Sequence, residues 1–284
     1  MIKMIKKNAM MLVCAIIVLV SCGHRNVETA SEEAMTTADT HSLVPDGYDM
    51  FVALQDVANQ MSADLFAGQN DTLLQQLLPD GSAPSSISAF LLKGKGKVIL
   101  FDAGLGAERG GMIMQKLDSL QIAPEQVTDI CITHFHFDHI GGLLTADGKA
   151  QFPAATLHVA DAECDAWLNG ALKQNNGQVQ KMLAAYGDRV ERFTAGDTLL
   201  GDIVTIAAPG HTPGHVLYDL GSVLIVGDLL HAVALQLPHP EFSARYDNDQ
   251  QLAAETRQSV LEMAKEQHRT LAGMHFPYPF IIEF

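Results

Sequence analysis

The sequence contains few of the residues that several protein classes need. It has four Cys in 284 residues, and only Cys131 and Cys164 follow position 22, too few for a disulfide framework. Lys and Arg number 18 against 33 Asp and Glu, so the formal charge is −15. A chain this acidic does not bind nucleic acid by general electrostatics, because phosphates require clustered cations. No Gly-x-Ser-x-Gly motif is present, so a serine nucleophile of that kind is not indicated.

A short apolar run lies near the N-terminus. Three Lys precede the apolar residues 10–20, which end in Ser21-Cys22-Gly23. A bilayer-spanning helix needs about 20 apolar residues, so this shorter run predicts a signal peptide over residues 1–21. Leu19-Val20-Ser21-Cys22 resembles the lipobox of bacterial lipoproteins, which implies a lipid anchor on Cys22; an ordinary secretory signal is the alternative. We expect an exported protein of the bacterial periplasm or cell envelope, attached to a membrane only through this anchor.

The residues after the signal divide into a tether and a body. Residues 22–45 begin with the expected lipidated Cys and are polar and acidic, which is typical of a flexible tether. Removal of residues 1–21 takes away three Lys and no acid, so the formal charge of −15 becomes −18. Residues 46–284 are enough for one large domain or two small ones, and we favour a single catalytic domain.

Two strand-turn-strand units indicate an internal duplication. In each unit the second strand is a continuous apolar run that ends in Asp, which is typical of a buried strand. The units comprise residues 87–92 with 97–102, and residues 216–220 with 223–228. A further pair, residues 130–133 and 203–208, is interpreted as equivalent because each segment leads into a His-bearing loop.

Helices are predicted between and after these strands. Residues 113–120 carry apolar side chains on one face, and residues 179–186 follow the i, i+3, i+4, i+7 pattern before a Gly. Asp249 is expected to cap a helix with Ala253 and Val260 on its inner face. Strands alternating with helices indicate a layered α/β domain with its functional loops at the strand ends.

The densest group of chemical side chains is His134-Phe135-His136-Phe137-Asp138-His139, directly after the predicted strand 129–133. Side chains alternate along an extended backbone, so His134 and His136 can point to the same side, with Asp138 and His139 in the following turn. Four potential ligands in six residues predict a metal site.

Further motifs occur in the order seen in one family. Gly210-His211-Thr212-Pro213-Gly214-His215, Gly227-Asp228 and a late His275 follow the His134 cluster. In this respect the chain resembles the metallo-β-lactamase superfamily from about Ile87 to His275. The resemblance implies a four-layered αβ/βα sandwich with an internal duplication and a dinuclear site at one edge of the paired sheets.

The resemblance also implies a ligand assignment. His134, His136 and His211 are assigned to one metal; Asp138, His139 and His275 to the second; and Asp228 bridges the two. Imidazole and carboxylate ligands suit two divalent ions, with Zn expected first and Mn or Fe as alternatives. Asp102 and His215 are expected to orient these ligands through hydrogen bonds. Turn capping is the simpler alternative for Asp102.

Such a site predicts a hydrolase that directs a metal-bound hydroxide at an ester, lactone or phosphotriester. Asp138 is expected to orient that hydroxide. Asp228 replaces the Cys ligand of common zinc β-lactamases, so antibiotic cleavage is not favoured. The segment around Gly227 to His231 is more similar to the methyl parathion hydrolase-like branch, close to the lactonases. These lactonases usually have Tyr where His231 stands, so His231 is either a hydrogen-bond and proton donor or a packing residue.

Two other functions stay open. A thioester hydrolase resembling glyoxalase II would need basic residues after the last metal ligand, whereas His275 is followed by Phe276-Pro277-Tyr278-Pro279-Phe280. This apolar segment favours an uncharged or hydrophobic small-molecule substrate. A metal-binding lipoprotein without catalytic activity is the other alternative.

Overall fold

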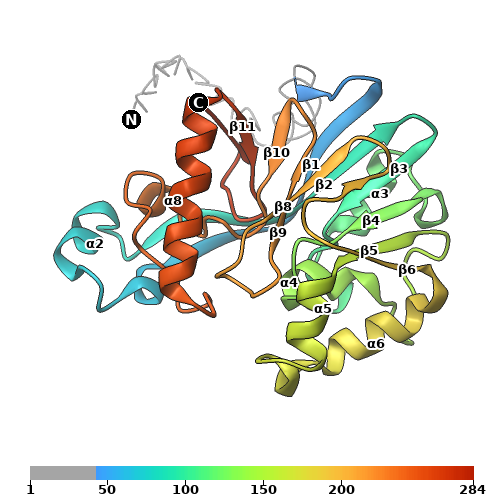
Figure 1. The fold of residues 1–284 in the computed structure, drawn as a ribbon, viewed down its shortest axis with the longest axis horizontal. Helices are drawn as coiled ribbons and strands as arrows, with labels where there is room; N and C mark the ends of the chain where they lie inside the picture. The colour runs from blue at the N-terminus through green and yellow to red at the C-terminus, as the bar shows by residue number, and fades with distance from the viewer. Residues whose placement is uncertain (1–42) are drawn as a thin grey trace, which may run out of the picture.

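The computed structural model describes residues 43–284, and the expected signal peptide and the expected lipid anchor on Cys22 lie outside this range. Two six-stranded sheets form the centre of the molecule (Figure 1). The first contains, in spatial order, β1 (Tyr48–Ser62), β2 (Ser82–Gly94), β3 (Lys97–Phe101), β4 (Asp129–Cys131), β5 (Thr156–Ala160) and β6 (Val190–Phe193). The second contains β12 (Ile281–Glu283), β11 (Thr270–Ala272), β10 (Val223–Ile225), β9 (Val216–Asp219), β8 (Ile203–Ala207) and β7 (Thr198–Leu199).

Helices cover the outer faces of the two sheets. The α-helices are α2 (Asp71–Leu77), α3 (Ile113–Ser119), α4 (Phe137–Ile140), α5 (Asp161–Leu168), α6 (Gly177–Tyr186), α7 (Val233–Gln236) and α8 (Gln250–Glu266). Single 3-10 turns comprise Ala63–Phe66, Ala107–Arg109, Pro124–Gln126, Gly141–Leu143, Lys173–Asn175 and Gly187–Arg189. Within residues 43–284, no helix combines the length and apolar character that a bilayer crossing requires.

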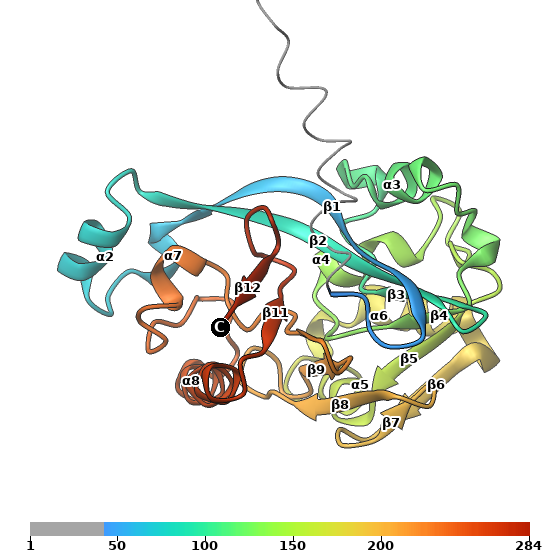
Figure 2. The ribbon, with the colours of Figure 1, turned by 90° about the horizontal axis from the view of Figure 1, so that it is seen from above.

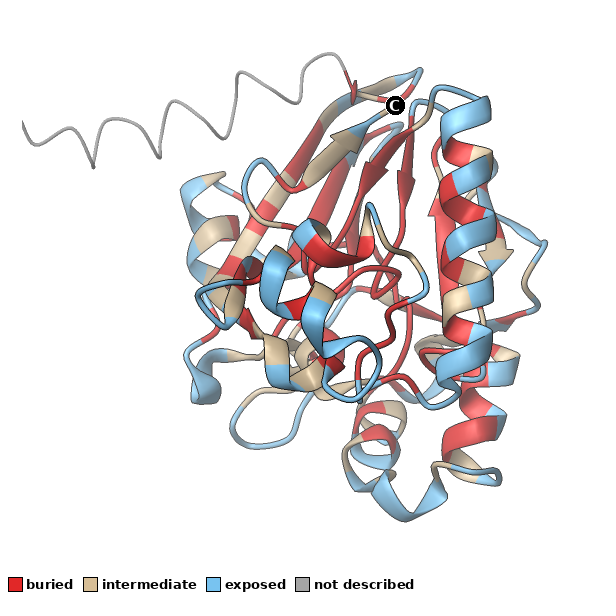
Figure 3. Ribbon diagram, turned by 90° about the vertical axis from the view of Figure 1, so that its left-hand side faces the viewer, coloured by how far each residue is buried: buried red, intermediate tan, exposed pale blue. Residues whose placement is uncertain are grey.

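The period-2 alternation of strand side chains divides the core into layers. In β2, Leu91 packs towards the helices α3, α5 and α6, whereas its neighbours Phe90 and Leu92 pack between the two sheets. In the second sheet, Leu224 faces α8 and Ile225 faces the first sheet. Figure 3 shows buried residues along the strands and exposed residues along the outer side of α8. The predicted four-layered sandwich is thus present.

The duplication is visible in the strand order. The neighbours β1 to β4 pair antiparallel, antiparallel and parallel, and β8 to β11 repeat this sequence of pairings. The hairpins β2–β3 and β9–β10 are therefore equivalent, as predicted. However, β4 corresponds to β11, and β8 corresponds to β1, so the expected equivalence of residues 130–133 and 203–208 is wrong. Both segments are apolar strands before a His loop, but that local pattern does not encode which strand lies beside them.

The first strands and the start of the folded body differ from the predictions. β1 and β2 form a long hairpin that extends beyond the sheet towards α2 and α7 (Figure 2). Leu43, expected in the tether, is buried at 6% exposure, and its carbonyl oxygen accepts a 2.9 Å hydrogen bond from Ser222 Oγ. The folded body therefore includes at least the last residues of the expected tether. The helix α8 has the predicted cap, because Asp249 Oδ1 accepts from Leu252 N at 3.0 Å.

Candidate metal centre

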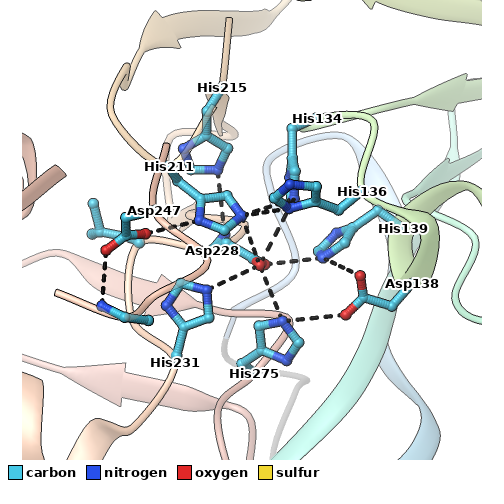
Figure 4. A network of polar contacts seen from close by, with 12 residues as sticks. His134, His136, Asp138, His139, His211, His215, Asp228, His231, Asp247 and His275 are labelled. Atoms are coloured by element: carbon cyan, nitrogen blue, oxygen red, sulfur yellow. Dashed lines mark hydrogen bonds and ion pairs between the residues drawn. The ribbon is translucent and has the colours of Figure 1, made fainter. Parts of the chain in front are cut away.

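The candidate ligands meet where equivalent strands of the two halves end. Asp102 and Asp228 follow β3 and β10, while His134 and His275 follow β4 and β11. Because neighbouring parallel strands end at the same edge of a sheet, each pair of loops lies side by side. The close packing of the two sheets then brings residues that are far apart in sequence to one point (Figure 4).

Three imidazoles form the first ligand group. His134 Nε2 lies 3.0 Å from His136 Nδ1 and 3.1 Å from His211 Nε2, and His136 Nδ1 lies 2.8 Å from His211 Nε2. These spacings approach the separation of about 3.3 Å between nitrogens that share one tetrahedral cation at 2.0–2.1 Å. Burial lowers the pKa of His134 well below its usual value and that of His136 to about 3. Both imidazoles are therefore neutral at pH 7, as metal binding requires.

The second group contains Asp138, His139 and His275. Their ligand atoms lie within 4.8 Å of one another. His275 Nε2 is 3.5 Å from Asp138 Oδ2, and His139 Nε2 is 3.9 Å from Asp138 Oδ1. Asp138 lies on the one-turn helix α4, and its side chain is 21% exposed. It is thus the most accessible side chain of this group and can contact both a metal and a small molecule.

Asp228 connects the two groups. Its Oδ2 lies 3.2 Å from His211 Nε2, and its Oδ1 lies 3.0 Å from His139 Nε2. Burial alone raises the pKa of Asp228, but the surrounding histidines outweigh this effect and hold the pKa well below the usual range. The carboxylate is therefore ionised, and it contacts both groups, because Oδ2 also lies 3.1 Å from His275 Nε2.

Two polar atoms of the centre are buried without a hydrogen bond. His139 Nε2 and Asp228 Oδ1 are buried and have no hydrogen-bond partner, although they lie 3.0 Å apart. Buried polar atoms are nearly always paired in proteins. Two such atoms that face one point, beside three clustered imidazole nitrogens, are the donor set of a metal site.

Most of the ligand imidazoles are oriented through their second ring nitrogen. His139 Nδ1 bonds to Asp102 Oδ2 at 2.6 Å, as the sequence predicts, and His211 Nδ1 bonds to Asp247 Oδ1 at 2.9 Å. His275 Nδ1 donates to the carbonyl oxygen of Ser86 at 2.8 Å. Such contacts select the tautomer and the direction of the ring, so the free nitrogen points into the centre.

The sequence matches a known protein family. The family model described as the metallo-beta-lactamase superfamily matches residues 83–275. The chain belongs to this superfamily.

Two solved structures cover most of the chain. The hydrolase AbOPH, described as a member of the beta-lactamase superfamily, is 31% identical and covers 84% of this chain and 92% of its own, with a TM-score of 0.74. AidC, a dizinc quorum-quenching lactonase solved with the product N-hexanoyl-L-homoserine, is 25% identical and covers 83% and 92%, with a TM-score of 0.75. A probable metallo-hydrolase of Mycobacterium tuberculosis is 31% identical over 134 residues, and the match spans 41% of each protein.

The candidate ligands also depend on residues that carry no recognisable motif. Asp247 lies 36 residues after its partner His211 and is itself held by the buried Arg257, whose Nη2 is 3.3 Å from Asp247 Oδ2. Ser85 and Ser86 of β2 bond through their hydroxyls to the carbonyl oxygens of His275 and Met274, at 2.9 Å and 3.0 Å. No sequence motif indicates these residues, because their partners are distant in the chain.

Glu163 of α5 joins the loops that carry the first group. Its carboxylate is 1% exposed and accepts four hydrogen bonds, two to each oxygen. The donors are Phe135 N at 2.8 Å, Trp167 Nε1 at 2.7 Å, Thr212 Oγ1 at 2.7 Å and Gly214 N at 3.0 Å. Phe135 lies between two ligands, and Thr212 directly follows a third. Glu163 therefore fixes the position of one ligand loop relative to the other.

His215 supports the backbone of Asp228. Its Nδ1 donates to Ala208 O at 3.1 Å, which leaves Nε2 to accept from Asp228 N at 3.3 Å. Burial lowers the pKa of His215 to about 3, so the ring is neutral and can accept. Gly227 has φ +51, and a Cβ there would lie 2.4 Å from His215 Nε2. A glycine is therefore required for this approach.

The ring of His231 lies inside the centre beside Asp228. Its ring is 1% exposed, and neither ring nitrogen has a hydrogen-bond partner. Nε2 is 3.3 Å from Asp228 Oδ2, and the ring is stacked on His275 with a centroid distance of 5.4 Å. The loop is positioned by Gln236 Oε1, which accepts from His231 N at 2.7 Å. The structure thus places His231 Nε2 beside the Asp228 carboxylate and leaves Nδ1 without a partner.

A cavity of about 670 Å³ opens onto both groups. Its lining includes His136, Asp138 and Asp228 together with apolar side chains such as Phe135, Phe137 and Trp167. None of the described residues that line it is Lys or Arg. The volume is that of a small-molecule site.

Proposed function

We propose that the protein is a dinuclear metal-dependent hydrolase of an ester, lactone or phosphotriester. The observation that carries this proposal is the position of Asp228, whose carboxylate contacts imidazoles of both ligand groups. Two Zn ions are the expected occupants, and Mn or Fe suit the same nitrogen and oxygen ligands. The match to curated relatives spans only about two fifths of their length, so the activity is inferred from the site.

The ligands divide into three roles. His134, His136 and His211 would hold one ion, Asp138, His139 and His275 the other, and Asp228 both. When bound, such a pair of ions lowers the pKa of a water molecule and polarises the oxygen of a carbonyl or phosphoryl group.

Two side chains of the centre are assigned to proton handling and substrate orientation. Asp138 is partly exposed to the cavity, so its carboxylate can accept a hydrogen bond from the attacking water and aim it at the substrate. His231 Nδ1 has no partner, and burial lowers the pKa of His231, so the ring is neutral and can donate a hydrogen bond to a substrate oxygen. We assign to it the role of stabilising the oxygen that becomes negative, or of protonating the leaving group.

The cavity supports a substrate whose reacting part is uncharged. Its wall near the ligands is formed by aromatic and aliphatic side chains, without a cation to bind a carboxylate there. AbOPH is described as a hydrolase and AidC as a lactonase, and both descriptions support this class of substrate. A glutathione thioester carries two carboxylates and is less well suited to such a wall.

The experiment that tests the proposal is hydrolysis of a substrate panel by the metal-loaded protein from residue 43 onward. We expect turnover of aryl esters, lactones or phosphotriesters at neutral pH, and loss of turnover when a chelator removes the metal. Preference for glutathione thioesters would support the thioester hydrolase. Metal binding at about two ions per chain without turnover of any substrate would support a binding role instead.

We also propose that the protein is exported and anchored through Cys22 with its centre facing away from the membrane. Leu43 bonds to Ser222 in the turn that precedes β10, whereas Asp228 follows the other end of the same strand. The tether would thus leave the body at the end opposite the metal centre. Release of the protein from the membrane fraction by Cys22→Ala tests the anchor.

A further inference from the structure

A second cavity, of about 360 Å³, lies beside the metal centre and is not used by the proposed reaction. The loop after β3, the loop after α4 and helix α6 form its walls. Leu105 and Gln178 line this cavity and also the cavity of the metal centre. The two cavities are therefore neighbours, separated by these two side chains.

The walls of the second cavity are preformed. Asp56 is 1% exposed, and its carboxylate accepts from the backbone N–H groups of Leu105, Met112 and Ile113, which fixes both ends of the loop after β3. The opposite wall is joined to this loop, since Gly142 N donates to Gly104 O at 3.1 Å. A cavity bounded by such bonds keeps its shape without a ligand.

Its charges differ from those of the metal centre. Arg109 and Lys181 line it, and in the described part of the chain neither forms an ion pair with a carboxylate. The guanidinium of Arg109 lies 4.0 Å from the ring centroid of Phe137, a residue that lines the metal cavity. Both cations are exposed, so they can contact an anion that enters the cavity from solvent. Glu108 is the acid on the same rim that opposes them.

We infer that the second cavity is a subsite for a carboxylate at the far end of the substrate. The reacting group lies at the metal centre, an apolar segment crosses Leu105 and Phe137, and the terminal carboxylate is held by Arg109 and Lys181. Asp56 also lines the cavity, but it is 1% exposed and three N–H dipoles point at its carboxylate, which weakens its repulsion of a bound anion. The inference rests on the proposed function and adds that the substrate is apolar in the middle and anionic at one end.

The test compares aryl esters of dicarboxylic acids, with one carboxyl group free, against aryl esters of monocarboxylic acids of the same length. A second series carries the free carboxylate on the alcohol side. We expect one series to contain a chain length at which the carboxylate raises kcat/KM about fivefold, which corresponds to about 1 kcal/mol for a partly exposed ion pair. The advantage should decrease at high ionic strength.

Charge variants assign the effect to the subsite. Arg109→Gln and Lys181→Gln should each reduce the ratio of kcat/KM between carboxylated and neutral esters, whereas Glu108→Gln should increase it. Lys173→Gln is the matched control, because Lys173 is an exposed cation of the neighbouring turn that does not line the cavity.

The outcomes separate this inference from the proposed function. Hydrolysis of neutral esters without any carboxylate preference in either series would overturn the subsite and leave the hydrolase proposal intact. A preference that Arg109→Gln and Lys181→Gln leave unchanged would also overturn it, since the carboxylate would then bind elsewhere. Absence of all ester, lactone and phosphotriester hydrolysis would overturn both.

Discussion

Replacement of Glu163 by Gln tests whether one buried carboxylate aligns the two ligand loops. The amide oxygen of Gln can keep the hydrogen bonds from Phe135 N and Trp167 Nε1, which reach one carboxylate oxygen at 2.8 Å and 2.7 Å. The NH2 group then replaces the second oxygen and cannot accept from Gly214 N. Thr212 can adapt by rotating its hydroxyl, but the backbone N–H of Gly214 cannot.

The expected magnitude follows from this single loss. A hydrogen bond to a charged group contributes about 1.5–3 kcal/mol, and a buried donor left unpaired costs about 1–3 kcal/mol. The neutral side chain is less costly to bury than a carboxylate, which offsets part of the loss. We therefore expect Glu163→Gln to lower the free energy of unfolding by about 2 kcal/mol and the metal affinity by at least about tenfold.

The assay separates the two effects. Urea unfolding of chelator-treated protein measures stability, and competition with a chromogenic chelator measures metal affinity. Asp165→Asn is the matched control, because Asp165 lies on the same helix but is 65% exposed and pairs only with Arg192; it should change stability by less than about 1 kcal/mol. If Glu163→Gln behaves like this control in both measurements, the alignment argument is refuted.

Three other perturbations address separate parts of the molecule. His134→Ala with His136→Ala should remove most bound metal, and metal analysis that still gives about two ions per chain would show that the ligand assignment is wrong. His231→Gln should reduce kcat by about 10²-fold or more with unchanged metal content; an unaltered rate would return His231 to a packing role. Burial raises the pKa of Asp129, but hydrogen bonds from His158, Thr128 and Lys97 outweigh this and lower it to about 2. A lowered carboxylate pKa stabilises the fold above the ordinary value of 3.8 and loses this effect as the pH falls towards 2. The difference in unfolding free energy between wild type and Asp129→Asn should therefore decrease over that range, and a pH-independent difference would contradict the pairing.

Local signals predicted the individual elements well. The Asp249 cap, the hairpin turns after Gly94 and Leu220, and the apolar face of α6 all depend on residues within a few positions of one another. Local patterns were insufficient where the neighbour in space is distant in sequence. The equivalence of β8 with β1 depends on the order of strands within each sheet, and the burial of Leu43 involves a contact with the distant Ser222.

The candidate site divides in the same way. The type and order of the ligands from His134 to His275 were readable because metal chemistry admits few residue types and the first four lie within six residues. Asp247, Glu163 and Ser86 carry no motif, since a hydrogen-bond acceptor can come from any element that the fold brings near. Their contribution was visible only in the structure.

The sequence by itself determined that this protein has buried strands, a layered α/β fold and a His- and Asp-rich centre, because periodicity and ligand chemistry are local properties. Only the tertiary structure decided that Asp228 faces both ligand groups, that Asp247 and Glu163 orient them, and that a second cavity with Arg109 and Lys181 adjoins the centre. Those features depend on how two sheets pack face to face, and packing joins residues that no sequence spacing relates.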